Sequence, residues 1–262
     1  MDLSRFSMEG RTVVITGGSG GIGMGCARAF AGAGANIVIV GVPAESIAPA
    51  VAEIELLGAE TLGVIADVSK VKDVDAMVKQ TLERFGRIDT LVNVAGGTYS
   101  RNPEMPQFIR APLIDLEEQD FMTTFDVNVK SVYLCSKEVV PLMQAQGKGV
   151  IINMASGAGH ENGRPLMGMG AYAASKAAII NLTKTMAHEW GPHIRVNCIC
   201  PGLIDTPRTS AARTQEEEDA RVARIDLKRI GVPEDVGRLA LYLTSDAASY
   251  ISGSAFDIDG GG

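Results

Sequence analysis

The chain lacks the sequence features with which proteins commonly bind nucleic acids or cross membranes. Lys and Arg number 24 against 31 Asp and Glu, a formal net charge of −7, and the basic residues form no cluster. A nucleic-acid partner is therefore not expected. No apolar run approaches the ~20 residues that span a bilayer. The first residues also lack the apolar core of a signal peptide. We expect no membrane contact and a cytoplasmic location.

Cysteine is scarce, with only four residues in the chain: Cys26, Cys135, Cys198 and Cys200. None has CxxC spacing, and no Cys/His cluster has the spacing of a zinc site, so no bound metal is predicted. Cys198 and Cys200 would share one face of a strand, which is a packing pattern. We expect buried free thiols in a reducing compartment. The chain also lacks internal repeats, low-complexity tracts and linkers, which favours a single domain over residues 1–262.

Short apolar runs rich in β-branched residues alternate with longer helical patterns along the whole chain. The runs predict strands at 12–16, 36–40, 61–66, 90–94, 150–154, 194–199 and 255–258. Helices are predicted up to about residue 33, at 45–57 and 70–85, and through residue 189. This alternation predicts an α/β fold with a doubly wound parallel sheet, the Rossmann fold, covered by helices on both faces.

Three long stretches without a regular pattern interrupt this alternation, at 97–116, 157–170 and 203–226. Long loops in compact α/β domains are usually functional. We expect the third to be a lid over the substrate, in which the acidic run 216–219 forms the solvated side of a short helix. Arg208 and Arg213 in this lid are expected to be solvated, although they could meet an anionic substrate.

A glycine-rich turn follows the first predicted strand and begins the first predicted helix. It reads Gly17-Gly18-Ser19-Gly20-Gly21-Ile22-Gly23. Small residues let the backbone turn tightly and approach a pyrophosphate, which then rests on the helix N-terminus. The position between a strand and a helix indicates dinucleotide binding. The alternative is a glycine turn used only for close helix–strand packing.

The end of the second strand should distinguish the two nicotinamide dinucleotides. An acidic residue there would hold the ribose 2′-hydroxyl of NAD, and an arginine would accept the 2′-phosphate of NADP. The chain has Gly41-Val42-Pro43, which offers neither group. A phosphate without a cation is poorly compensated, whereas a hydroxyl can use backbone groups or water. The sequence therefore favours NAD over NADP.

Tyr172 and Lys176 stand four residues apart in a predicted helix, so their side chains share a face. A free phenol has a pKa of about 10, too high for ready proton exchange at neutral pH. A nearby ammonium favours the phenolate, and we expect Lys176 to lower the pKa of Tyr172. The pair is a candidate acid/base, although a solvated helix face with a partly buried ring would have the same spacing.

Further motifs follow one another in a fixed order. They are Thr16-Gly17-x-x-x-Gly21-Ile22-Gly23, Asp67-Val68, Asn93-Val94-Ala95-Gly96, Asn128 in Asp126-Val127-Asn128-Val129, Ser156 in Asn153-Met154-Ala155-Ser156, Tyr172-x-x-x-Lys176, and Pro201-Gly202-Leu203-Ile204-Asp205-Thr206. In these motifs the chain resembles the short-chain dehydrogenase/reductase family over essentially its whole length. The resemblance implies an enzyme that interconverts a secondary alcohol and a ketone by hydride transfer to or from a nicotinamide.

The same resemblance implies roles for four catalytic residues. Tyr172 would be the general acid/base, Lys176 would stabilise the phenolate and bond the nicotinamide ribose, and Ser156 would donate to the developing alkoxide. Asn128 would hold a water that links Lys176 to solvent. The implied cofactor-binding residues are Gly17, Ser19, Gly21, Ile22, Gly23, Gly41, Asp67, Val68, Asn93, Ala95, Gly96, Tyr172, Lys176, Pro201, Gly202, Ile204 and Thr206.

Substrate identity depends on the loops. Ser156 and Tyr172 are further apart than is usual in the family, and the extra residues should lie in 158–170 and enlarge the pocket wall. Met167 and Met169 are candidates for that wall, since methionine suits an adaptable apolar surface. His160, Glu161, Asn162 and Arg164 are expected at the surface. We expect a mid-sized apolar or cyclic alcohol or ketone, and a 3-oxoacyl thioester on an acyl carrier protein is the alternative.

Two other readings compete with this one. The same fold could run enoyl reduction or dehydration, but the intact Ser156, Tyr172 and Lys176 set argues against it. A dinucleotide-sensing binding protein without turnover should have lost one of the four catalytic residues, and none is lost. The resemblance also implies a homotetramer or homodimer in which the helices at 129–146 and 177–190 pack across a twofold axis.

Overall fold

The computed structural model describes residues 3–98, 111–160, 168–210 and 214–262. Its centre is a seven-stranded, entirely parallel sheet in the order β3-β2-β1-β4-β5-β6-β7. The strands are β1 (Thr12–Thr16), β2 (Asn36–Gly41), β3 (Thr61–Ile65), β4 (Thr90–Asn93), β5 (Gly149–Met154), β6 (Ile194–Pro201) and β7 (Ala255–Ile258). The predicted doubly wound sheet is confirmed, and every predicted strand is present within one or two residues of its expected ends.

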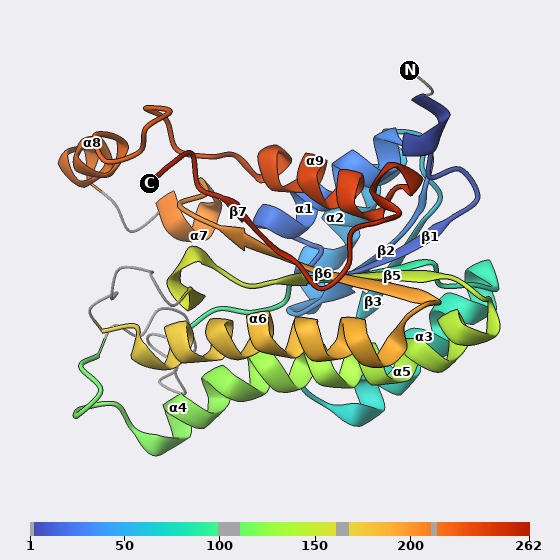
Figure 1. Ribbon diagram of the computed structural model, residues 1–262, viewed down its shortest axis with the longest axis horizontal. Helices are drawn as coiled ribbons and strands as arrows, with labels where there is room; N and C mark the ends of the chain where they lie inside the picture. Colours follow the sequence, from blue (N-terminus) through green and yellow to red (C-terminus); the bar gives the residue numbers. More distant parts are fainter. Residues whose placement is uncertain (1–2, 99–110, 161–167, 211–213) are drawn as a thin grey trace.

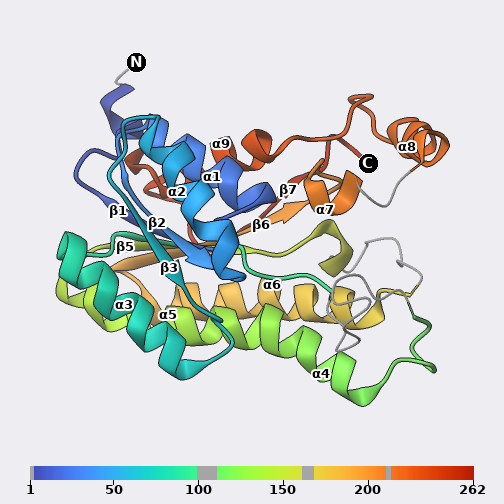
Figure 2. The same ribbon diagram turned by 180° about the vertical axis from the view of Figure 1, so that it is seen from behind.

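Helices cover both faces of the sheet, as Figures 1 and 2 show. One layer contains α1 (Gly21–Gly32), α2 (Ile47–Glu55) and α9 (Pro233–Thr244), and the other contains α3 (Val71–Phe85), α5 (Ser131–Ala145) and α6 (Gly170–Trp190). Shorter helices are α4 (Glu118–Phe125), α7 (Pro207–Ser210) and α8 (Gln215–Val222). Single turns of 3₁₀ helix lie at Leu3–Phe6, Ala44–Ser46, Gly157–Gly159 and Asp246–Ala248, and a π-helical turn lies at Asp126–Lys130.

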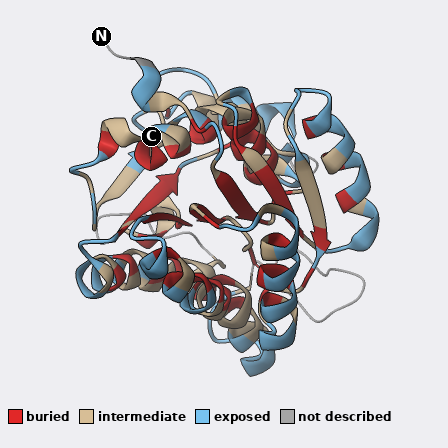
Figure 3. Ribbon diagram, turned by 90° about the vertical axis from the view of Figure 1, so that its right-hand side faces the viewer, coloured by how far each residue is buried: buried red, intermediate tan, exposed pale blue. Residues whose placement is uncertain are grey.

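The core consists of two apolar layers, one on each side of the sheet. The central strands are buried along their whole length, which is why they read as continuous apolar runs rather than alternating patterns. Figure 3 shows these buried strands between half-exposed helices. Both layers end near the carboxyl ends of the strands, where the connecting loops emerge.

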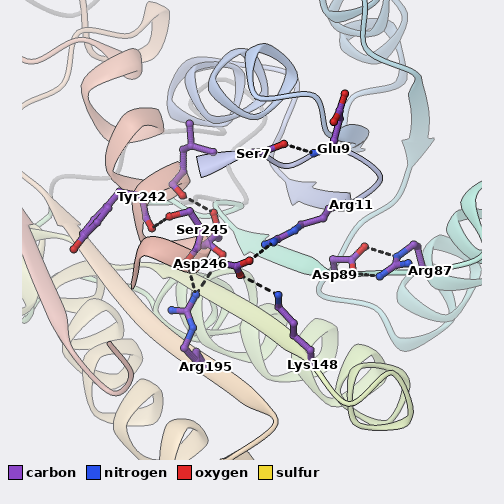
Figure 4. A network of polar contacts seen from close by, with 12 residues as sticks. Ser7, Glu9, Arg11, Arg87, Asp89, Lys148, Arg195, Tyr242, Ser245 and Asp246 are labelled. Atoms are coloured by element: carbon purple, nitrogen blue, oxygen red, sulfur yellow. Dashed lines mark hydrogen bonds and ion pairs between the residues drawn. The ribbon is translucent and has the colours of Figure 1, made fainter. Parts of the chain in front are cut away.

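The amino ends of the strands are held together by polar contacts (Figure 4). Asp246 accepts from Arg11 at 2.8 Å and from Lys148 at 2.9 Å, which joins the starts of β1 and β5 to the end of α9. Arg195 donates to the carbonyls of Leu243 and Ser245, at 2.8 and 3.2 Å. A cation at these last carbonyls compensates the negative end of the helix dipole. The amino ends of the strands are therefore joined by ion pairs, and the functional loops emerge at the carboxyl ends.

Four helices differ from the expectations. α2 begins at Ile47 because residues Ala44–Ser46 form a 3₁₀ turn first, and it ends at Glu55 rather than Leu57. α4, α7 and α9 were not predicted at all. In α9 the Pro at the first helical position and the acidic first turn are helix-start signals that the sequence does carry. The acidic run lies in α8 and is largely exposed, which confirms the predicted short helix, while its role in a lid stays a prediction.

Candidate active site

The predicted functional residues meet at the carboxyl ends of β1, β4 and β5. The strand order reverses between β1 and β4, since β2 and β3 lie to one side and β5 to β7 to the other. In open parallel sheets, ligands bind in the crevice at this switch point. The glycine loop after β1, the loop after β4 and the lid after β6 all begin here (Figure 1).

The glycine loop adopts a conformation that only glycine accommodates easily. Gly17 and Gly21 have φ of +64° and +48°, in the left-handed region. A Cβ on Gly23 would lie 2.1 Å from the carbonyl oxygen of Gly17, so the start of α1 could not pack on the loop. Gly20 provides no side-chain cap, and the first turn of α1 contains no acidic residue. The free N–H groups and dipole of this 12-residue helix therefore fit a pyrophosphate.

Thr16 connects this loop to the loop after β4. Its Oγ1 atom accepts hydrogen bonds from the backbone N–H groups of Val94 and Ala95, each at 3.2 Å. Gly17 also lies against Ala95, because a Cβ on Gly17 would be 3.0 Å from its backbone. The predicted cofactor residues Gly17, Ala95 and Gly96 thus border one crevice.

Asn93 is used differently from the other predicted cofactor residues. Its Nδ2 donates to Asn153 Oδ1 at 2.9 Å and to Ser136 Oγ at 3.3 Å, and Asn153 donates in turn to Thr183 Oγ1 at 3.0 Å. All four side chains are buried. The Asn93 side chain therefore serves the interior of the sheet, and a contact with a cofactor would have to come from its main chain.

Two hydroxyls mark the far end of the crevice, beside the end of β2. Ser46 Oγ donates to Ser19 Oγ at 2.9 Å, and a Cβ on Gly41 would lie 3.4 Å from that same Ser19 oxygen. Asp67 follows β3, and its carboxylate accepts from the backbone N–H and hydroxyl of Ser69. Val68 is buried in the core. The neutral Ser19 and Ser46 hydroxyls thus lie where the adenosine ribose is expected, and the Asp67 carboxylate follows the neighbouring strand, β3.

Ser156, Tyr172 and Lys176 come together where β5 ends and α6 begins. Ser156 is in extended conformation two residues beyond β5, and its Oγ accepts from Ala158 N at 3.2 Å. The loop after Ser156 then lies flat on α6, since a Cβ on Gly159 would be 2.6 Å from the carbonyl carbon of Lys176. This close approach brings Ser156 beside Tyr172, although the two residues are sixteen positions apart in the sequence.

Lys176 is buried and donates from Nζ to the carbonyl oxygen of Met154 at 2.8 Å. Its Nζ lies 5.6 Å from the centroid of the Tyr172 ring. Loss of hydration lowers the pKa of Lys176 from its usual 10.5 to about 8. The ammonium therefore faces the ring and a backbone carbonyl.

The expectation that Lys176 lowers the pKa of Tyr172 is wrong. Loss of hydration raises the pKa of the Tyr172 phenol, and the Ser156 hydroxyl and the Arg208 guanidinium act in the opposite direction. Arg208, not Lys176, is thus the cation that favours the phenolate here. Burial of the phenol removes water that would stabilise its charged form, and this effect outweighs that of the nearby cation. The spacing of Tyr172 and Lys176 in the sequence does not reveal this burial.

Asn128 lies in the π-helical turn between α4 and α5 and is completely buried. Its Oδ1 accepts from Gly97 N at 2.7 Å, and its Nδ2 donates to Gly97 O at 2.9 Å and Ser175 Oγ at 2.8 Å. Ser175 donates to the carbonyl of Tyr172 at 2.7 Å. Such π-helical turns are frequent at functional sites. Asn128 therefore connects the loop after β4 to the catalytic turn of α6, and its role in holding a water stays a prediction.

The segment after β6, predicted to be a lid, contacts the crevice at several points. A bridge between Ile204 and Gly231 fixes its base, and Thr206 reaches the glycine loop, where a Cβ on Gly21 would lie 3.1 Å from Thr206 Cγ2. Arg208 in α7 donates from Nη1 to the carbonyl of Gly96 at 3.0 Å. Arg208 is exposed as expected, but it also reaches across to the catalytic side. Arg213 lies outside the described residues.

A small pocket opens beside Tyr172. Its lining residues are Thr98, Leu116, Thr124, Gly168, Met169, Ala171 and Tyr172. The two long loops meet here, since Ala111 N donates to Gly168 O at 3.1 Å and Gly170 packs against Leu113. Met169 therefore lines the pocket as predicted. Met167, Glu161, Asn162, Arg164 and residues 99–110 lie outside the described part of the chain.

Two positioning residues escaped the sequence analysis. The Ser175 hydroxyl donates to the carbonyl oxygen of Tyr172 and accepts from Asn128 Nδ2. Gly159 lies in the 157–170 stretch, where the sequence shows no regular pattern. A serine one position before Lys176 carries no sequence signal of its own, because its partner Asn128 lies 47 residues away.

Comparison with known proteins gives one consistent family. A sequence model of the family described as enoyl-(acyl carrier protein) reductase matches residues 17–262. The chain is 37% identical to the 3-oxoacyl-[acyl-carrier-protein] reductase FabG of Thermotoga maritima, over 97% of this chain and 98% of that protein. It is 34% identical to the 7alpha-hydroxysteroid dehydrogenase of Escherichia coli K12, over 97% and 95%.

A solved structure has nearly the same backbone. It is a 7α-hydroxysteroid dehydrogenase complexed with NADH and 7-oxo glycochenodeoxycholic acid, and it superimposes with a TM-score of 0.91 at 33% identity. The superposition covers all of this chain and 98% of the other. No helix in the described part of this chain has the length and apolar character needed to cross a membrane.

Proposed function

Because the chain belongs to the short-chain dehydrogenase/reductase family, we propose that its substrate is a mid-sized apolar or cyclic secondary alcohol or the matching ketone. The chain is an NAD(P)-dependent oxidoreductase that interconverts an alcohol and a ketone. The observation that carries the proposal is the pocket beside Tyr172, whose walls include Leu116, Met169 and Ala171. Apolar and adaptable walls favour apolar substrates of variable shape.

Tyr172 is the proposed general acid/base. A bound nicotinamide dinucleotide accepts the hydride from the alcohol carbon or returns it to the ketone. Tyr172 removes the hydroxyl proton in oxidation and delivers it to the carbonyl oxygen in reduction. Ser156 donates a hydrogen bond to the same oxygen and stabilises negative charge as it develops. The family resemblance supports these roles, and the proximity of Ser156 to the phenol is consistent with them.

Lys176 and Asn128 support the proton transfer. With a pKa of about 8, Lys176 can exchange a proton near neutral pH, and its Nζ lies between Met154 and the tyrosine ring. Asn128 Oδ1 has one lone pair beyond its bond to Gly97. We place the relayed water there, between Lys176 and solvent.

The residues fit a dinucleotide along the crevice from Gly41 to Thr206. The uncapped start of α1 suits the pyrophosphate, and Ile22, Asp67, Val68, Pro201, Gly202 and Ile204 complete the proposed set. Ser19 and Ser46 present neutral hydroxyls next to Gly41. No cation stands in residues 41–46, so a 2′-phosphate would have no charged partner from this segment. We therefore prefer NAD to NADP, and comparing the two dissociation constants tests the preference.

Reduction of a 3-oxoacyl thioester is the second candidate, because one of the similar proteins is a 3-oxoacyl-[acyl-carrier-protein] reductase. The net charge of −7 and the lack of a basic cluster give an acidic carrier no complementary surface. This is why the free alcohol or ketone is ranked first.

The location and assembly follow from further features of the chain. All four cysteines are buried and unpaired, which is consistent with a reducing compartment such as the cytoplasm. The exposed sides of α5 and α6 are available for packing across a twofold axis, and we propose a homotetramer or homodimer built on them.

The test is an absorbance screen of NAD(H) and NADP(H) with a steroid alcohol, cyclic alcohols, a polyol and acetoacetyl thioesters. We expect turnover of the apolar or cyclic compounds above the others. Preferred turnover of the thioester would replace the first candidate with the second. Binding of dinucleotide without turnover of any compound would support the non-catalytic sensor.

Replacing the tyrosine tests the mechanism independently of the substrate. Tyr172→Phe should lower turnover by about 10²–10⁴-fold, since it removes general acid/base catalysis, while dinucleotide affinity changes little. Tyr133→Phe, on the outer side of α5, is the matched control and should retain full turnover. A Tyr172→Phe enzyme as active as the native one would remove Tyr172 from its assigned role.

A further inference from the structure

Three side chains with metal-binding atoms lie together behind the catalytic turn of α6. They are His160 at the end of the Gly157–Gly159 turn, Cys200 near the end of β6 and Asp257 in β7. One ligand atom from each lies within 4.8 Å of the other two. The residues are far apart in the chain, so spacing along the sequence could not reveal them.

The contacts of His160 are unusual for a surface ion pair. Its Nε2 lies 2.5 Å from Asp257 Oδ1, yet this buried nitrogen has no well-aligned hydrogen bond among the described residues. The Asp257 oxygen therefore lies close to the His160 nitrogen but outside the direction of an N–H bond. Two donor atoms that converge without a good hydrogen bond are the arrangement a cation can use.

The burial of Cys200 excludes nucleophilic catalysis, the other function that a cluster of Cys, His and Asp suggests. A Cys–His–Asp relay needs a thiolate that a substrate can reach, but Cys200 has no solvent exposure. The hydrogen bond with Cys198 and then burial raise the pKa of the Cys200 thiol. A metal ion makes no such demand, because it needs only an entry path. Asp257 is 55% exposed in its side chain and provides that path.

We propose that His160, Cys200 and Asp257 bind one zinc ion, with water as the fourth ligand. Thiolate, imidazole and carboxylate are the ligand types that zinc takes in tetrahedral sites. Zinc–ligand distances of about 2.0–2.3 Å at tetrahedral angles put neighbouring ligand atoms about 3.3–3.6 Å apart. His160 Nε2 and Asp257 Oδ1 would therefore separate from 2.5 Å, and any ligand pair as wide as 4.8 Å would close. On binding, the Cys200 S–H bond breaks, a sulfur–zinc bond forms, and the proton passes to solvent.

The site would fasten three segments that the substrate pocket depends on. His160 follows Ser156 by four residues in the turn that lies on α6, and Cys200 immediately precedes Pro201 at the base of the lid. β6 and β7 already pair at Cys200 and Asp257. Zinc would add a link from this pair to the Ser156 loop, and it should therefore raise the thermal stability of the chain.

Cobalt(II) is the spectroscopic probe for the site. One equivalent added to the purified, chelator-treated protein should give the visible bands of tetrahedral cobalt together with a thiolate-to-cobalt charge-transfer band, and zinc should displace both. Cys200→Ser should abolish the charge-transfer band. Asp257→Asn, at a largely exposed position, should weaken cobalt binding by about tenfold or more with the fold intact.

Two other cysteines are the controls. Cys135→Ser, in α5, should retain the full spectrum. Cys198→Ser is the critical comparison, because Cys198 Sγ lies only 4.0 Å from Cys200 Sγ. Loss of the charge-transfer band in Cys198→Ser but not in Cys200→Ser would overturn the assignment. So would a native protein without these bands, or an affinity that Asp257→Asn leaves unchanged.

Discussion

At the scale of single residues, the buried charge of Lys176 is the feature with the clearest measurable effect. Its pKa falls from 10.5 to about 8 because the folded chain removes its water. Between these values the unfolded chain binds more protons, so this residue makes stability rise with pH from about 8 to 10.5 and costs most below pH 8.

Lys176→Met should remove that dependence. We compare the free energy of unfolding of the variant with that of the native protein at each pH. The difference, variant minus native, should be about 2 kcal/mol larger at pH 7 than at pH 10. Denaturant unfolding at both pH values measures the difference. Lys184→Met, at an exposed position of the same helix, is the control and should show no such change. An equal difference in both variants would contradict the lowered pKa.

Arg208 should set the pH range of the reaction. Its charge lowers the pKa of Tyr172 and also acts downward on that of Lys176. Arg208→Gln should therefore raise both pKa values and move the pH profile of alcohol oxidation to higher pH. Arg224→Gln, exposed at the end of the lid, is the control. A profile unchanged in Arg208→Gln would mean that the guanidinium leaves the site during turnover.

At the scale of elements, α1 and α9 cross at two glycines. A Cβ on Gly25 would lie 2.3 Å from the carbonyl oxygen of Pro233, and one on Gly237 would lie 2.2 Å from that of Gly25. The helices therefore touch backbone to backbone. This contact holds α1, whose first turn is the proposed pyrophosphate site, against α9.

Gly25→Ala should consequently destabilise the protein by about 2 kcal/mol or more, since rigid backbone must move. Gly32→Ala lies in the same helix with no atom within 4 Å of the new Cβ. It should be neutral or stabilising by less than about 1 kcal/mol. Thermal or chemical denaturation distinguishes the two, and similar values for both would argue against the close crossing.

Sequence reasoning found elements whose signal is local and missed those that depend on partners. The strands were predictable because burial on both faces leaves continuous apolar runs, and the glycine loop because its backbone demands glycine at fixed positions. The π-helical turn around Asn128 depends on contacts with α6, which no local pattern records. Helix α9 was missed although Pro233 and the acidic residues after it are local helix-start signals. The sign of the Tyr172 pKa shift likewise depends on burial, which a spacing of four residues does not reveal.

At the scale of the whole molecule, the outer side of α5 exposes Tyr133 to 47%. Lys137 Nζ lies 5.7 Å from the centroid of this ring, but the ring is otherwise open to solvent. An exposed aromatic side chain is consistent with the proposed twofold interface over α5 and α6. Tyr133→Glu should therefore dissociate the assembly, because it would bury a charge without a partner.

Light scattering of the native protein and the variant measures this effect. Leu56→Glu is the control, since Leu56 is 87% exposed beyond the end of α2 on the other face of the sheet. It should leave the mass unchanged. A monomeric native protein would dismiss the proposed assembly, and an unchanged Tyr133→Glu mass would place the interface elsewhere.

A buried hydrogen-bond network also fixes the register of β4 and β5. Its members are Asn93, Asn153, Ser136 and Thr183. Asn93 pairs directly with Asn153 across β4 and β5. A register shift of one residue would turn Asn93 to the opposite, apolar face of the sheet. Several buried polar groups would then lack hydrogen-bond partners, and each would reduce the free energy of unfolding by about 1–3 kcal/mol. The fixed register also sets where the chain leaves the sheet. The loop that begins at Val94 and the turn that contains Ser156 therefore start at the same level of the sheet, independently of the surface loops.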